Sequence, residues 1–126
     1  MPAMLEHTNL TVSDPDATAA WMCDLFCWHV RWSGAAMQSG RTVHVGTNTH
    51  YLALYTPGSP AKPSDDNYQT VGGLNHIAVV VDDIAAMERD VAKAGFTPMN
   101  HADYEPGHRF YFLDHDNIEF EIVQYG

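Results

Sequence analysis

The sequence predicts an α+β protein built from two copies of one βαβββ module. The main observation is a repeated stretch, because residues 5–14 (LEHTNLTVSD) are echoed by residues 74–83 (LNHIAVVVDD). In both copies a histidine stands third, alternating apolar residues follow, and an aspartate closes the run. These histidines, His7 and His76, are 69 residues apart in a chain of 126 residues. An offset of this size divides the chain into two related halves.

The composition is typical of one globular domain spanning residues 1–126, with 45% hydrophobic and 17% charged residues. No apolar run approaches the roughly 18 residues of a membrane helix, and the first residues lack the basic-then-apolar order of a signal peptide. We therefore expect a cytoplasmic protein without a membrane partner. Six Lys and Arg against sixteen Asp and Glu give a net charge of −10. This balance argues against nucleic acid as a partner, because phosphate binding requires a basic surface.

The first module is predicted to occupy about residues 1–56. Its first strand is expected over residues 6–12, and a helix over residues 17–27 follows the start signal Ser13-Asp14-Pro15-Asp16. Gly34, Gly40 and Thr47-Asn48 are expected to mark turns. Three strands are predicted between and after these turns, over residues 29–33, 41–46 and 51–55.

A segment rich in Pro, Gly, Ser and Asp, about residues 57–72, is predicted to link the modules and to be mobile. The second module, about residues 73–126, repeats the element order of the first. We expect a strand over 75–81, a helix over 84–94 closed by Gly95, a polar loop over 102–107, and strands over 97–101, 109–113 and 119–125. One helix covers only one face of a four-stranded sheet, so the modules are expected to pack as a pair.

The whole chain resembles the vicinal oxygen chelate superfamily, which includes glyoxalase I, fosfomycin- and bleomycin-resistance proteins, methylmalonyl-CoA epimerase and extradiol dioxygenases. Its most specific part is residues 110–121 (FYFLDHDNIEFE), which is similar to the family's Asp-Pro-Asp-Gly-Asn turn and the apolar-Glu pair after it. His115 replaces the Pro and Asn117 replaces the Gly, and Asn is the next-best residue for a left-handed turn position. The resemblance implies a glyoxalase-like fold in which the two modules form a curved mixed-sheet cup.

The resemblance also implies a metal site made by His7, His76 and Glu121. Two imidazoles and one carboxylate bind a divalent ion on one side and leave about three positions open. Fe(II) is the favoured ion, with Mn, Ni or Zn as alternatives. The fourth ligand of glyoxalase I and of the epimerase falls on Ala53, which cannot bind a metal. Three ligands are typical of extradiol dioxygenases and of fosfomycin-modifying transferases.

Three more residues match polar groups around the metal of extradiol dioxygenases. The resemblance implies that His50 is a general base near neutral pH and that Tyr111 donates a hydrogen bond to bound oxygens. His101 matches a second histidine with one residue of slippage. Each residue also has a plain structural interpretation, since His50 flanks a turn, His101 borders a polar loop, and Tyr111 suits an amphipathic core position.

Several functions therefore stay open. The first is a metal-dependent, dioxygenase-like enzyme that chelates a small vicinal-oxygen (catechol-like) substrate. The alternatives are a glyoxalase I-like lyase, a fosfomycin-type transferase, and a metal-free ligand-binding module of the bleomycin-resistance type. Against the transferase, His101 stands near the expected Lys position and no Arg follows Glu121. The exposed sheet edges of such modules predict a homodimer.

Overall fold

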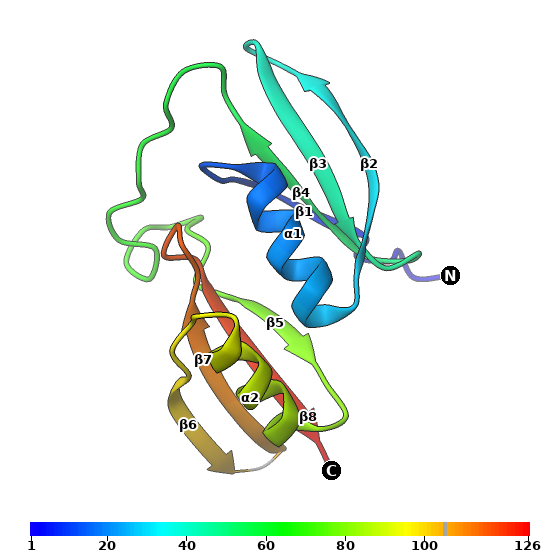
Figure 1. The fold of residues 1–126 in the computed structure, drawn as a ribbon, viewed down its shortest axis with the longest axis vertical. Helices are drawn as coiled ribbons and strands as arrows, with labels where there is room; N and C mark the ends of the chain where they lie inside the picture. Colours follow the sequence, from blue (N-terminus) through cyan, green and yellow to red (C-terminus); the bar gives the residue numbers. More distant parts are fainter. Residues whose placement is uncertain (105) are drawn as a thin grey trace. The chain divides into compact units, whose positions relative to one another are not determined.

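The computed structural model describes residues 1–104 and 106–126 and contains, within them, two helices and eight strands (Figure 1). The chain divides into two compact units, Met1–Lys62 and Pro63–Gly126. Each unit holds one βαβββ module. The predicted α+β class and the internal repeat are therefore confirmed.

The first unit is a four-stranded mixed sheet with one helix. Its sheet order is β1-β4-β3-β2, with β1 parallel to β4 and the other neighbours antiparallel. The predicted turn at Gly34 is wrong, because Gly34, Ala35 and Ala36 stay paired with β3 and lengthen β2. The elements are β1 (His7–Thr11), α1 (Pro15–Phe26), β2 (His29–Ala36), β3 (Gly40–Gly46) and β4 (Tyr51–Thr56).

Helix α1 starts at Pro15, earlier than predicted, because Asp14 caps it. The Asp14 side chain accepts a hydrogen bond from the Ala17 amide at 3.1 Å, and Pro15 suits the first turn, where its missing N–H costs nothing. The helix ends before Cys27, which adopts a left-handed conformation. One face of α1 packs against β3 and β4. The core residues on these elements are Ala19, Met22, Leu25, Val43, Val45, Leu52 and Leu54.

The second unit repeats this topology with the sheet order β5-β8-β7-β6. The predicted polar loop over 102–107 is wrong for its first part, since Ala102, Asp103 and Tyr104 pair with β7 and extend β6. The strand begins at Met99, after Pro98, which has no N–H to donate to a sheet. The elements are β5 (Ile77–Val80), α2 (Ile84–Lys93), β6 (Met99–Tyr104), β7 (Gly107–Leu113) and β8 (Glu119–Tyr125).

The turns of the second unit follow the sequence signals. Gly95, with φ +96°, ends α2 as predicted, and its amide donates to the Ala92 carbonyl. Asn117, with φ 59°, takes the left-handed position in the turn before β8. The core beneath α2 is aromatic, because Phe112 stacks with Phe96 and with Phe120, in each case at 5.3 Å between ring centroids.

The predicted linker is divided between the units at Lys62 and Pro63. Its later part is held by hydrogen bonds, since the Asp66 side chain accepts from the Gln69 amide and the Asp66 carbonyl accepts from the Thr70 hydroxyl. Among the described residues, neither helix has the length and apolar character to cross a membrane.

Candidate functional site

The two sheets place repeat-equivalent residues at equivalent register positions. In the first unit β1 pairs with β4, so that His7 lies opposite Tyr51 and Asn9 lies opposite Ala53. In the second unit Ala78 of β5 lies opposite Glu121 of β8. Ala53 is therefore the structural counterpart of Glu121, as the 68-residue offset between positions 53 and 121 predicts.

His76 and Glu121 come together in the second unit. The Nε2 atom of His76 is 3.0 Å from Oε1 of Glu121. Arg109 Nη1 donates to the other carboxylate oxygen, Oε2, at 2.9 Å. The Glu121 and Arg109 side chains are only 8% and 13% exposed. A carboxylate buried to this degree requires such partners, because desolvating an unpaired charge is costly.

Tyr111 lies on the same sheet face as Glu121. The two residues are register partners on β7 and β8, and the Tyr111 ring stands edge-on to the His76 ring at 5.7 Å. Burial, followed by the nearby Glu121 charge, raises the pKa of Tyr111. Its hydroxyl therefore stays protonated at neutral pH and is able to donate a hydrogen bond.

A second carboxylate borders this group. Glu119 Oε2 accepts a hydrogen bond from the Tyr68 hydroxyl at 2.5 Å, which raises the pKa of Tyr68 to about 12. The same oxygen is 3.8 Å from Nδ1 of His76, too far for a direct hydrogen bond. Within the described chain, Nδ1 of His76 is buried without a hydrogen-bond partner.

The structure does not bring His101 to this group. His101 Nε2 is 3.0 Å from the Glu88 carboxylate on α2, and its ring stacks with Phe110 at 5.9 Å. Phe110 is buried on the helix side of the sheet, whereas its neighbour Tyr111 points to the other face. His101 is thus on the opposite side of the sheet from Glu121.

The equivalent face of the first unit is aromatic. The His7 ring stacks on Tyr51 with 4.7 Å between centroids, and His7 Nδ1 lies 2.8 Å from the Glu6 carboxylate. The His44 ring is also 4.7 Å from Tyr51 and 5.1 Å from Trp32. Desolvation by burial lowers the pKa of His44, so this imidazole is neutral at pH 7.

His50 lies in the exposed turn between β3 and β4. Its Nδ1 atom is 2.9 Å from the Thr49 hydroxyl, and its amide donates to Thr47 Oγ1 at 3.2 Å. These contacts are local to the turn. They orient the imidazole without burying it.

Sequence reasoning missed four residues of these faces: Tyr68, Arg109, Glu119 as a hydrogen-bond acceptor, and His44. Two of them had a usable signal, since strand alternation places Arg109 on the face of Tyr111, and the repeat makes His44 the counterpart of Tyr111. Tyr68 had none, because it lies in the predicted linker.

Metal binding was considered for these groups. Among residues 1–104 and 106–126, no three His, Cys, Asp or Glu side chains are gathered as a metal site. The His76–Glu121 pair nevertheless has a suitable separation, because two ligands about 2.1 Å from an ion and at right angles lie about 3.0 Å apart. Both are ordinary donors for a divalent transition metal.

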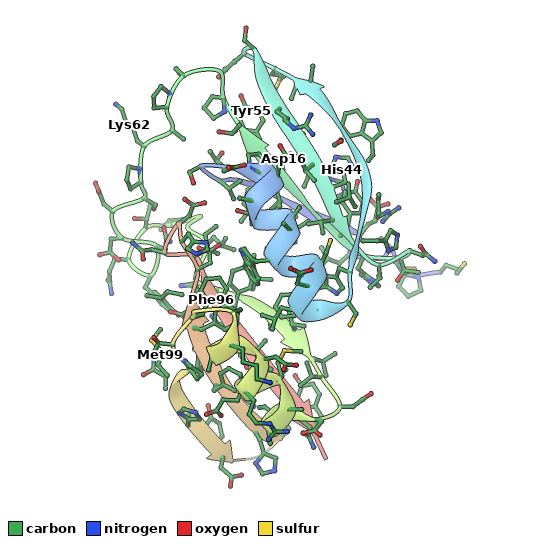
Figure 2. All side chains as sticks on the ribbon, viewed as in Figure 1. Asp16, His44, Tyr55, Lys62, Phe96 and Met99 are labelled. Atoms are coloured by element: carbon green, nitrogen blue, oxygen red, sulfur yellow. The ribbon has the colours of Figure 1, made fainter. Side chains whose placement is uncertain are left out.

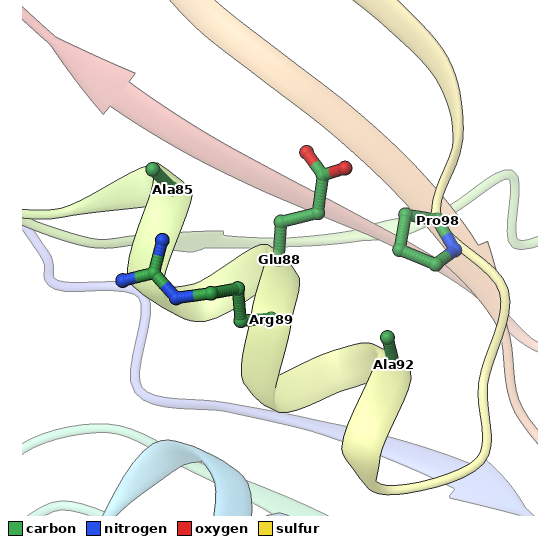
Figure 3. Close-up of a pocket in the computed structure, with 5 residues that line it drawn as sticks. All are labelled: Ala85, Glu88, Arg89, Ala92 and Pro98. Atoms are coloured by element: carbon green, nitrogen blue, oxygen red, sulfur yellow. The ribbon is translucent and has the colours of Figure 1, made fainter.

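Three pockets border the units. The first unit has one of about 480 Å³ on the uncovered sheet face, where His44 and Tyr55 lie on β3 and β4 (Figure 2). In the second unit a surface pocket of about 500 Å³ runs along α2, with Glu88 and Arg89 beside Pro98 (Figure 3). A smaller one of about 220 Å³ includes His101. The last two share Glu88, which is already paired with His101.

The fold and sequence define the family. The sequence profile of the Glyoxalase/Bleomycin resistance protein/Dioxygenase superfamily matches residues 4–122. The chain belongs to this superfamily. No protein of curated function matches the chain.

Solved structures share the fold at low sequence identity. A glyoxylase/bleomycin resistance protein/dioxygenase domain from Frankia sp. EAN1pec is 22% identical, with a TM-score of 0.83 and full coverage of both chains. A mutant of the fosfomycin resistance protein FosX from Listeria monocytogenes, complexed with Mn(II) and a dihydroxypropylphosphonic acid, is 20% identical; the TM-score is 0.73 and coverage is 98% of this chain and 93% of that one. TioX from Micromonospora sp. ML1 is 17% identical, with a TM-score of 0.70 and coverage of 98% and 100%.

Proposed function

We propose that this protein is a metal-dependent enzyme that acts on a small molecule with two adjacent oxygens, as extradiol dioxygenases act on catechols. The observation that carries the proposal is the 3.0 Å separation of His76 Nε2 and Glu121 Oε1, which suits two neighbouring ligands of one ion. His7, the repeat equivalent of His76, is the proposed third ligand. Fe(II) is the favoured ion, and Mn, Ni or Zn are the alternatives.

The surrounding residues have defined tasks in this proposal. Arg109 holds one oxygen of Glu121 and directs the other toward His76, the orienting role that groups behind a metal ligand usually have. A bound divalent ion supplies charge that favours deprotonation of a chelating hydroxyl. Tyr111 donates a hydrogen bond to a substrate oxygen, and the exposed imidazole of His50 accepts the released proton. His101 receives no catalytic role, because it is paired with Glu88 on the helix side of the sheet.

One observation favours a second function, a metal-free ligand-binding module. Both oxygens of Glu121 already have protein partners, His76 and Arg109. A carboxylate with two such partners is satisfied without an ion. In this alternative the cluster stabilises the sheet, and the protein binds its ligand without transforming it.

Metal analysis separates the two functions. The protein is purified anaerobically, and its metal content is measured beside His76→Ala, Glu121→Gln and the matched control His101→Ala. We expect about one equivalent of a transition metal in the parent protein and in the control, and its loss in the other two variants. Circular dichroism verifies that each variant is folded.

The identity of the metal then directs the activity assay. Iron leads to oxygen-uptake measurements with catechols, whereas zinc, nickel or manganese shifts the assay to lyase, isomerase or transferase reactions. A parent protein that neither retains nor takes up a divalent metal would overturn the enzyme proposal. The ligand-binding module would then be the remaining function.

A further inference from the structure

The pocket on the first unit's sheet is formed by residues from all four strands. One row across the sheet is Asn9, Ala53, His44 and Trp32, in register on β1, β4, β3 and β2. The next row includes Tyr55, Thr42 and Gly34. The pocket of about 480 Å³ is lined by Asn9, Trp32, Ala35, Ala36, Met37, Thr42, His44 and Tyr55. This volume is within the range of small-molecule sites, roughly 300–1,000 Å³.

The wall of the pocket is an indole held in place by a glycine. A Cβ atom on Gly34 would lie only 2.7 Å from Cζ2 and 3.0 Å from Cη2 of Trp32, so the indole lies across the Gly34 backbone. The other contact of the indole is the His44 ring at 5.1 Å. Trp32 is nevertheless 51% exposed. A large aromatic surface is thus held in one orientation and left partly uncovered beside the pocket.

The far side of the pocket is fixed by a hydrogen bond. The Tyr55 hydroxyl donates to the Met37 carbonyl at 3.1 Å and so ties β4 to the turn that follows β2. The Met37 side chain is 76% exposed and unbranched, which suits contact with ligands of varied outline. The pocket therefore has one rigid aromatic wall and one adaptable apolar wall.

The polar groups of the pocket are neutral and gathered on a few residues. Its lining includes no Asp, Glu, Lys or Arg. The Asn9 amide and the Thr42 hydroxyl have no hydrogen-bond partner among the described residues, and the His44 imidazole is near both strands that carry them. Neutral donors and acceptors of this kind match hydroxyl or carbonyl groups on a ligand and leave a charged group unpaired.

We infer that this pocket binds a planar aromatic molecule, stacked on Trp32, with hydroxyl groups along one edge directed to Asn9 and Thr42. Aromatic rings prefer stacked or edge-on contacts with each other, which the Trp32 and Tyr55 rings offer. The inference goes beyond the proposed function, because it needs no metal. It assigns recognition of the ring to the first unit alone.

Binding is measured by calorimetry on the full-length protein in EDTA, so that metal chelation plays no part. The probe is naphthalene-2,3-diol, and cis-cyclohexane-1,2-diol is the matched probe with the same two hydroxyls and no aromatic ring. We expect the aromatic diol to bind and the aliphatic diol to bind at least about ten-fold more weakly.

The decisive variant is Gly34→Ala. Its methyl group displaces the far end of the Trp32 side chain, which is free to move, while the pocket keeps all its chemical groups. We expect binding of the aromatic diol to weaken about ten-fold in Gly34→Ala and in Trp32→Ala. Thr42→Val should weaken it about three- to ten-fold through one lost hydrogen bond. The control Val30→Ala, on the same strand but paired with buried Val45 on the helix side, should leave it unchanged.

Either of two results would overturn the inference. One is equal binding of the aromatic and aliphatic diols, or no binding of either. The other is unchanged affinity in both Gly34→Ala and Trp32→Ala while circular dichroism shows folded protein. Since EDTA is present throughout, failure of the metal proposal leaves this test intact, and failure of this test leaves the metal proposal intact.

Discussion

The two units share one topology but differ in the chemistry of the sheet face that the helix does not cover. The row Asn9-Ala53-His44-Trp32 in the first unit corresponds to Ala78-Glu121-Tyr111-Met99 in the second. One row is neutral and aromatic, and the other contains a buried carboxylate paired with His76 and Arg109. The helix-side faces, by contrast, are apolar in both units. The repeat thus keeps its core and varies its open face.

The largest expected effect comes from breaking the buried ion pair of the second unit. Arg109→Met leaves the Glu121 carboxylate, 8% exposed, without its guanidinium partner. Removing one member of a buried pair costs about 3–5 kcal/mol of unfolding free energy. Thr42 is the repeat counterpart of Arg109, and Thr42→Val should cost less than about 1.5 kcal/mol. Urea unfolding of both variants at pH 7 measures the difference.

The same variant sharpens the comparison when metal is added. If Glu121 binds a divalent ion, Mn(II) should restore part of the thermal stability lost in Arg109→Met, since a ligand that binds only the folded state stabilises it. Equal losses in Arg109→Met and Thr42→Val would contradict the distinction between the two faces.

A smaller effect is expected at the turn before the last strand of each unit. Asp114 Oδ1 accepts hydrogen bonds from the amides of Asp116 and Ile118, both at 2.9 Å, and its residue is buried. Thr47 makes the equivalent contacts at 3.2 and 3.4 Å with the exposed amides of His50 and Thr49. Asp114→Ala should cost about 1–3 kcal/mol. Thr47→Ala should cost clearly less, and equal costs by chemical denaturation would argue against a special turn in the second unit.

The smallest effect is a pH dependence specific to the first unit. The Arg41 guanidinium, 2.8 Å from Asp16, lowers the pKa of Asp16 below its usual 3.8 by hydrogen bonding. The folded state therefore binds this proton more weakly, and the stability from the pair is complete above pH 3.8. It is lost as the pH falls through the lowered pKa. The stability difference between the parent protein and Asp16→Asn should shrink between pH 5 and pH 3.

The repeat counterpart of Asp16 provides the control for this titration. Ala85 stands 69 residues after position 16 and has no carboxylate. Ala85→Ser should therefore show the same stability difference from the parent protein at pH 5 and pH 3. A difference between the parent protein and Asp16→Asn that grows on acidification would contradict the assigned ion pair.

The architecture was predictable because its signals are local. The two histidine-strand runs, the Asp14 and Asp83 helix caps, and the left-handed positions at Gly95 and Asn117 each depend on a few neighbouring residues. Errors occurred where pairing with another strand decided the outcome. Gly34 and the stretch after His101 look like turns, but β3 and β7 hold them in strands.

The site was predictable only in part. The repeat identified His76, and the family resemblance selected Glu121; the structure places these two in contact. Arg109 and Tyr68 reach their carboxylates through side-chain conformations and chain paths that no short-range pattern specifies. His101 shows the converse, because one residue of slippage in an irregular strand decides which face a side chain occupies.

The most direct test of the account is a titration of isotopically labelled protein with Mn(II), followed by NMR. A paramagnetic ion broadens the resonances of nearby amides, so the site is located without assuming it. We predict that one equivalent broadens the amides of His76 and Glu121, together with that of His7, and that Glu121→Gln abolishes the effect while His101→Ala does not. Broadening confined to exposed carboxylates such as Asp65 and Asp66, or none at one equivalent, would contradict the assignment of the His76–Glu121 pair to metal binding.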